Sequence, residues 1–293
     1  MNTYLLVICA SLLWVVATQF YAQIGRAIPI YRFNFYKTCI AFTLFLGGAI
    51  VGNGLNVLPA ALPYLFFSGL VGYALADLFI FYGFAKAGPA RTLMITSFEP
   101  SIIALFAYIF FDHTINLGKL SGIFMVFLCL YFLALEKKKT KKLIDKEATK
   151  VLGWIVIGMI LEALGTTFSK QAFIIDPKLT SMTANVYRLL PAFIILPLVT
   201  YFFKDTLSIK DLSMALRKKI IFSSIIGTWF ALFLWVKAIG LPGHPAVVAA
   251  LGSLSPFYAS IYEHTKSRSL PNRYFFCALL CMAIGVILIV SSQ

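Results

Sequence analysis

Three acidic residues lie inside long apolar stretches of this 293-residue sequence, where a charged side chain is expensive to keep. They are Asp77, Glu99 and Glu162, and each falls well within a run long enough to cross a membrane as a helix. An ionisable residue at such a position costs about 2.5 to 3.5 kcal/mol on insertion scales, so its presence is a hypothesis of function by default. Carboxyls in this setting bind cations or exchange protons.

Glu99 gives the strongest signal, because it directly precedes Pro100. The proline lacks a backbone donor and frees a carbonyl near Thr96, which creates a polar break beside the carboxyl. Ser255 and Pro256 form a second break of this kind without the acid, so we expect one side of the site to be more acidic than the other. A packing role for Glu99, as a protonated or internally hydrogen-bonded residue, is the weaker alternative.

The other two acids leave more room for structural explanations. For Glu162 a functional role is favoured by a smaller margin than for Glu99. Asp77 is evenly balanced between function and structure, because it could pair with Lys37 or Lys86. Removal from water disfavours the ionised form of a carboxyl, so these acids could also hold a coupling proton.

Aromatic side chains could form the apolar walls of the same site. Trp14, Tyr73, Phe81, Trp229 and Trp235 fall in the first, third and eighth apolar runs. Aromatic rings facing a carboxylate favour an organic cation or the amine of a zwitterion. The predicted substrate-binding residues are Trp14, Tyr73, Asp77, Phe81, Thr96, Glu99, Glu162, Thr166, Trp229 and Ser255, with helix breaks at Pro100 and Pro256.

Motifs of enzymatic chemistry are absent from the sequence. It contains no phosphate-binding glycine loop of the Walker type, no His/Cys metal cluster and no serine-nucleophile elbow. All five cysteines lie within apolar runs, where they are expected to act as small hydrophobic residues. The sequence therefore predicts a protein that is not an enzyme and that uses neither a metal nor a cofactor.

The elements that must position these residues are membrane-spanning helices. The chain is 60% hydrophobic and only 12% charged, which a soluble domain of this size does not need. Gly69 and Gly72 supply small residues where two such helices can approach closely. Ten spans are predicted, near 3–21, 32–52, 61–84, 90–111, 118–135, 151–173, 180–203, 219–238, 245–263 and 272–291.

The sequence also repeats itself at a distance of about 156 residues. Tyr31-Arg32 recurs as Tyr187-Arg188, and the apolar run broken at Pro100 recurs as the one broken at Pro256. Because each half has five predicted spans, the second half must cross the membrane in the opposite sense. We expect an all-α integral membrane protein with two inverted five-helix repeats, 1–136 and 151–293, around a central cavity, joined by a basic polar linker at 137–150.

Basic residues give the predicted orientation. The formal net charge is +14, but the lysines and arginines gather in the connections that follow the odd-numbered spans, which we call the odd connections. Because the charge is confined to these connections, nucleic acid is not the expected partner. Lys and Arg accumulate on the cytoplasmic side of a membrane. The pattern therefore predicts that the odd connections are cytoplasmic and that both termini lie outside.

Four sequence motifs, in the order in which they occur along the chain, resemble the EamA-type members of the drug/metabolite transporter superfamily. They are Leu12-Leu13-Trp14, Arg32 at the opening of the second span, Phe84-Ala85-Lys86-Ala87-Gly88-Pro89-Ala90 and Phe98-Glu99-Pro100. The resemblance covers essentially the whole chain. It implies a secondary carrier without a cofactor, with a central cavity formed by spans one, three, four, six, eight and nine. It also implies that both termini are cytoplasmic, opposite to the charge pattern.

Together these features predict a carrier that moves a small zwitterionic or cationic metabolite, such as an amino acid or a derivative, across the bacterial cytoplasmic membrane. Export is the expected direction, with uptake or exchange of a host or environmental metabolite as the alternative. A structural or assembly membrane protein is the alternative of another class. The expected partners are the substrate, the lipid bilayer and a coupling proton, with the chain acting as a monomer or homodimer.

Overall fold

The computed structural model describes residues 3–52, 54–111, 146–241, 255–267 and 272–291, with Val248, Gly252 and part of 117–135. Every regular element in this part of the chain is a helix. The first half contains α1 (Thr3–Ala27), α2 (Ile30–Val51), η1 (Pro59–Ala61), α3 (Leu62–Gly69), η2 (Leu70–Ala76), α4 (Asp77–Lys86), α5 (Pro89–Thr96) and α6 (Glu99–Phe111). The second contains α8 (Lys146–Ile175), α9 (Ser181–Phe202), α10 (Met214–Ser223), η3 (Ser224–Ala231), α11 (Leu232–Gly240), α13 (Ser255–Ser267) and α14 (Arg273–Ser291).

Seven of these helical stretches are long and apolar enough to cross a membrane. They correspond to the predicted spans one to four and six to eight, and the described part of the chain is helical as predicted. The predicted tenth span corresponds to α14. The predicted spans 118–135 and 245–263, and the linker 137–150, lie mostly outside the described residues.

Local sequence explains where several helices begin. Thr180 caps α9, because its side-chain oxygen accepts a hydrogen bond from the backbone N–H of Thr183. Ser213 caps α10 in the same way. Gly88 adopts a φ of 90°, which ends the preceding helix and which other residues rarely tolerate, and Pro89 then opens α5.

Two of the long helices contain a π-helical segment near their middle. One is η2, within the continuous helix Pro59–Lys86, and the other is η3, within Met214–Gly240. A π-helical turn departs from regular backbone hydrogen bonding and is often found at functional sites. The two segments therefore indicate a candidate functional region near the middle of the bundle.

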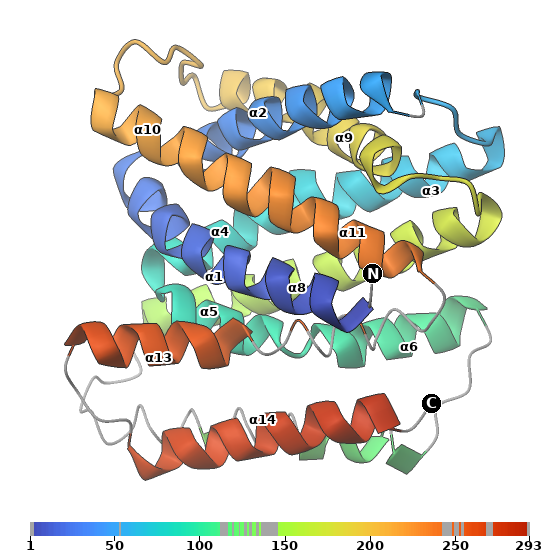
Figure 1. Cartoon of the computed structure of the whole chain (residues 1–293). Helices are drawn as coiled ribbons and strands as arrows, with labels where there is room; N and C mark the ends of the chain where they lie inside the picture. Colours follow the sequence, from blue (N-terminus) through green and yellow to red (C-terminus); the bar gives the residue numbers. More distant parts are fainter. Residues whose placement is uncertain are drawn as a thin grey trace.

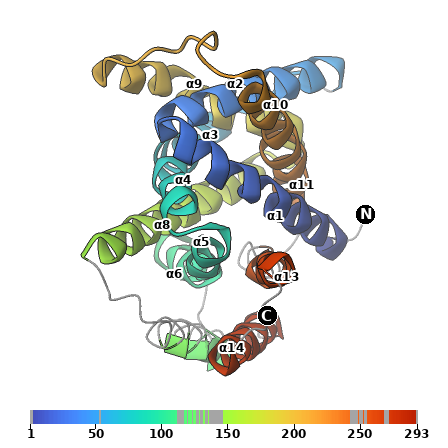
Figure 2. The same ribbon diagram turned by 90° about the vertical axis from the view of Figure 1, so that its left-hand side faces the viewer.

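The helices pack so that elements of one half contact elements of the other. α1 packs against α10, η3 and α11, while α8 packs against α3, η2 and α4. α2 crosses α9, and α5 contacts α13. Figures 1 and 2 show α5, α6 and α13 between α14 and the rest of the bundle. The two halves are thus interleaved instead of forming separate globules.

The connections divide between two ends of the bundle. The α1–α2 turn, the α4–α5 turn and residues 203–213 lie at one end, which we call the basic end because it carries Arg26, Lys86, Lys204 and Lys210 (Figure 1). The first turn of α1 and the last turn of α14 lie at the opposite end (Figure 1). Both ends of the chain therefore emerge on the same side.

Small residues bring α3 and η2 close to α8 and α9. Ser68 Oγ donates to the carbonyl of Gly165 at 2.6 Å. A Cβ added at Gly69 would lie 1.6 Å from the carbonyl oxygen of Arg188, and one added at Gly165 would lie 3.2 Å from the Cα of Gly72. The packing role predicted for Gly69 is confirmed, because a side chain there would push α3 and α9 apart, whereas a Cβ at Gly72 would meet the Cα of Gly165 at an ordinary contact distance of 3.9 Å.

Arg32 fastens the start of α2 to residues 203–213 at the basic end. Its Nη2 donates to Asp211 Oδ1 at 2.5 Å and also to the carbonyl of Ser208. Its Nε donates to the Tyr36 hydroxyl at 2.8 Å. The guanidinium also holds the pKa of the Asp211 carboxyl below its usual range. Arg32 therefore anchors a surface segment, which the repeat of Tyr31-Arg32 as Tyr187-Arg188 did not predict.

Candidate functional site

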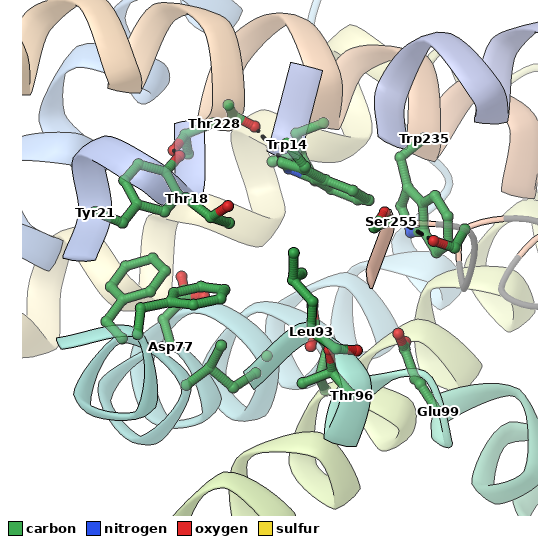
Figure 3. A pocket seen from close by; sticks show the side chains of 18 of the residues that line it. Trp14, Thr18, Tyr21, Asp77, Leu93, Thr96, Glu99, Thr228, Trp235 and Ser255 are labelled. Carbon is green, nitrogen blue, oxygen red and sulfur yellow. Dashed lines mark hydrogen bonds between the residues drawn. The ribbon is translucent and has the colours of Figure 1, made fainter. Parts of the chain in front are cut away.

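A cavity of about 130 Å³ lies among helices of both halves. Its lining comes from α1, α2, η2, α4, α5, α6, α8, α9, η3, α11 and the start of α13. Trp14 and Trp235 lie on one side of it, and Leu93, Thr96 and Glu99 lie on the opposite side (Figure 3). The site is therefore assembled from residues that are far apart in the sequence.

Most of the predicted substrate-binding residues line this one cavity. Those that line it are Trp14, Tyr73, Asp77, Phe81, Thr96, Glu99, Glu162, Thr166, Ser255 and Pro256. Trp229 does not: it packs against the hydrophobic core. Pro100 is buried behind the lining. The structure brings the predicted acids and aromatic residues together, while their role in binding stays a prediction.

Glu99 lies at a helix break. α5 ends at Thr96 and α6 begins at Glu99, so the carboxyl occupies the first turn of a helix, where the backbone dipole favours negative charge. Thr166 Oγ1 of α8 donates to Glu99 Oε1 at 3.0 Å. Glu162 lines the cavity one helical turn away from Thr166. Two carboxyls from the two halves thus share one cavity with a hydroxyl donor beside them.

Asp77 has a basic partner. Lys37 Nζ of α2 donates to Asp77 Oδ2 at 2.5 Å, and Lys37 is only 3% exposed. The same ammonium lies 4.7 Å from the ring centroid of Phe81. Lys86, the other partner considered for Asp77, instead lies over the ring of Tyr82. Asp77 and Lys37 therefore form a neutralised pair in the cavity wall.

We expect Asp77→Asn to destabilise the protein by about 3 kcal/mol, because it leaves the Lys37 ammonium buried without a counter-charge. The double variant Lys37→Met/Asp77→Asn should recover most of the lost stability, since it removes both charges. Thermal unfolding in detergent measures both effects. Lys86→Met, which changes an exposed lysine on the same helix as Asp77, is the matched control. Equal losses in the single and double variants would show that the pair does not act as a unit.

Arg188 of α9 also lines the cavity, and sequence reasoning did not select it. Its Nε donates to Ser68 Oγ at 2.8 Å, and its guanidinium lies 4.6 Å from the ring centroid of Tyr73. It is only 3% exposed. A cation inside an apolar run carries the same insertion penalty as an acid, and this penalty is the sequence feature from which a role for Arg188 can be predicted.

Aromatic contacts form the wall opposite Glu99. The rings of Trp14 and Trp235 lie 5.0 Å apart, and Trp14 Nε1 donates to the carbonyl of Gly227 in η3 at 2.9 Å. The Tyr21 hydroxyl lies 3.0 Å from Thr228 Oγ1, also in η3. Both contacts join α1 to a π-helical segment, so η3 holds the position of two ring systems in the wall (Figure 3).

The chemistry available in this cavity is recognition of charged and apolar groups. Carboxyls, two cations, hydroxyls and aromatic rings all line it. Within the described residues, no group of three or more His, Cys, Asp or Glu side chains could hold a metal ion. The arrangement suits a small organic molecule that has both a polar and an apolar part.

Comparisons with known proteins agree with this architecture. A crystal structure described only as "Crystal structure of protein" matches with a TM-score of 0.74 at 14% identity, over 99% of this chain and 97% of that chain. At this identity the likeness shows the fold alone. A search of curated proteins finds no match.

The family comparison covers nearly the whole sequence. The profile of the EamA-like transporter family matches residues 1–135 and 149–291. The resemblance drawn from the motifs is therefore confirmed. The members of this family are transporters. The chain therefore belongs to the EamA-like transporter family of the drug/metabolite transporter superfamily, and it is a multi-pass membrane transporter of small molecules.

Proposed function

We propose that the protein carries a small zwitterionic or cationic metabolite, such as an amino acid or a derivative, across the bacterial cytoplasmic membrane. The observation that carries the proposal is a cavity between apolar helices that is lined by Asp77, Glu99 and Glu162. Its volume of about 130 Å³ suits a molecule of modest size, since a protein cavity of roughly 150 Å³ holds benzene. Export is the proposed direction, and a gradient of the opposite sense would drive uptake or exchange.

The proposed scaffold is a pair of inverted five-helix repeats with ten spans in all. The inter-half contacts support it: α1 with η3 and α8 with η2 are the pairings that a two-fold relation would exchange. The occurrence of one π-helical segment in each half supports it as well. Phe132, in the predicted fifth span, packs against Ala278 and Met282 of α14, as the proposed fifth and tenth spans require.

The proposed mechanism is alternating access. One half rocks against the other and exposes the cavity first to one side of the membrane and then to the other. No cofactor is needed, because the gradient of the substrate or of a coupled proton supplies the energy. Glu99 and Glu162 are the proposed proton sites, since a carboxyl removed from water gains or loses its proton readily when a charged substrate arrives.

The basic end of the bundle is proposed to face the cytoplasm, which places both termini outside. A phosphatase reporter that folds only outside the cytoplasm, fused after Gln293, should therefore be active. The same reporter inserted between Lys204 and Lys210 should be silent, because that segment lies at the basic end. A reporter after Gln293 that works only in the cytoplasm would reverse the orientation.

Transport by the purified protein tests the proposed function. Metabolite profiles of cells with and without the protein would select candidates, and labelled candidates would then be followed in proteoliposomes preloaded with the same compound. We expect exchange of at least one amine-bearing metabolite well above that of protein-free liposomes. Failure to exchange any of the selected metabolites would favour a structural or assembly role.

A further inference from the structure

Arg188 differs from the other cation of the cavity, because no ion pair joins it to the described part of the chain. Lys37 is neutralised by Asp77 at 2.5 Å. By contrast, the Nη1 atom of Arg188 is buried and has no hydrogen-bond partner among the described residues. We infer that Arg188 receives an anionic group of the substrate, so that the transported molecule must carry a carboxylate or a similarly shaped anion. This inference rests on the proposed transport function.

The surroundings of Arg188 hold the guanidinium in place for such a contact. One edge is engaged, because Nε donates to Ser68 Oγ at 2.8 Å, and one face lies against the ring of Tyr73. The hydroxyl of Tyr73 is also buried without a partner among the described residues. A guanidinium with its Nε bound and an Nη free offers a fixed donor for a carboxylate oxygen. An unpaired buried charge is costly, so a substrate anion would be stabilised strongly here.

The sequences of the two halves explain why only one cation is neutralised. Asn34-Phe35-Tyr36-Lys37 in α2 corresponds to Asn185-Val186-Tyr187-Arg188 in α9, at a distance of 151 residues. The same distance relates Lys86 to Lys237, and Asp77 to Thr228. The second half thus keeps the cation at position 188 and has a neutral threonine where the first half has its counter-ion. Thr228 is instead engaged with the Tyr21 hydroxyl at 3.0 Å.

The Arg188 donor that has no partner among the described residues, and not the sum of the charges, favours a zwitterion over a simple cation. With Lys37 and Asp77 neutralising each other, the remaining ionisable groups of opposite sign are Arg188 and the carboxyls Glu99 and Glu162. A substrate carboxylate would lie on Arg188 and a substrate ammonium on the carboxyls. A cation without an anionic group would leave the buried Nη1 donor of Arg188 without a hydrogen-bond partner in the described part of the chain.

Matched probes test the inference on the unmodified protein. L-leucine would be compared with 3-methylbutylamine and 4-methylpentanoate, and L-phenylalanine with 2-phenylethylamine and 3-phenylpropanoate, as competitors of exchange in proteoliposomes. We expect at least one amino acid to compete about tenfold or more better than its amine, because the amine lacks the carboxylate that Arg188 binds. An amine that competes as well as its amino acid overturns the inference and leaves the proposed transport intact. Failure of any small molecule to exchange contradicts the transport function itself.

Variants at Arg188 provide the second test. Arg188→Gln should raise the KM for the amino acid about tenfold or more with a smaller change in maximal rate, and it should narrow the difference between amino acid and amine. Arg188→Lys, which keeps the charge, should restore part of that difference. Arg91→Gln, an exposed arginine on α5, is the control. An unchanged preference for the amino acid in folded Arg188→Gln would refute the assignment, whatever its overall rate.

Discussion

Glu99→Gln should lower transport in proteoliposomes by about 100-fold and weaken its dependence on pH, which Glu162 alone would then carry. The amide keeps the size of the side chain and can still accept the hydrogen bond from Thr166 Oγ1, so the helix break should remain folded. It cannot carry the negative charge that would face a substrate ammonium, nor can it exchange a proton. A 100-fold loss corresponds to about 2.7 kcal/mol, which is within the range for a desolvated charge-assisted hydrogen bond.

Two further variants sharpen this result. Glu147→Gln, which changes an acid of the predicted polar linker 137–150, should transport normally. Thr166→Val should have an intermediate effect, because it removes the hydroxyl donor and leaves the carboxyl. Flux through Glu99→Gln that is undiminished and keeps its pH dependence would remove Glu99 from the mechanism.

Gly69→Ala should prevent the protein from folding to its native packing. A Cβ at this position would lie 1.6 Å from the carbonyl oxygen of Arg188, and the obstacle is backbone that cannot rotate away. Overpacking typically costs about 1 to 3 kcal/mol, and we expect at least the upper value here. The fraction of protein that remains monodisperse in detergent after heating measures the effect.

Gly47→Ala is the control for that substitution. Gly47 is also in a long helix, yet a Cβ there would meet nothing within 4 Å. Alanine should be neutral or slightly stabilising at this exposed position, because it restricts the unfolded chain more than glycine does. Similar melting temperatures for Gly69→Ala and Gly47→Ala would show that α3 and α9 can separate without penalty.

The acids of the site could be predicted from sequence for a physical reason. A carboxyl in an apolar run is conspicuous, because its insertion into the membrane is costly and is retained only where the carboxyl has a function or an oppositely charged partner. Asp77, Glu99 and Glu162 stood out in this way, and all three line the cavity. Arg188 obeys the same rule but was overlooked, because Tyr187-Arg188 was matched to Tyr31-Arg32. The structure separates these two arginines, one at the basic end and one in the cavity.

Other features depended on backbone geometry that a sequence pattern does not reveal. Trp229 was predicted for the cavity wall, but it lies within η3, where π-helical turns alter the face that each residue occupies. Trp235, beyond this segment, lines the cavity. The long apolar runs did predict seven long apolar helices of the described chain, because length and hydropathy alone decide whether a helix can cross a bilayer.

The contact between Gly69 and the backbone of Arg188 has a consequence for motion. Two helices that approach backbone to backbone at a glycine can turn about their crossing more easily than they can slide along each other. A change of access that keeps this contact would use the crossing of α3 and α9 as its pivot. The guanidinium of Arg188 would lie beside that pivot. Distances between spin labels placed on α3 and α9 near the crossing should then change least among inter-half pairs. The part of the substrate bound to Arg188 would then move least during the transport cycle, while the two ends of the bundle would move farthest.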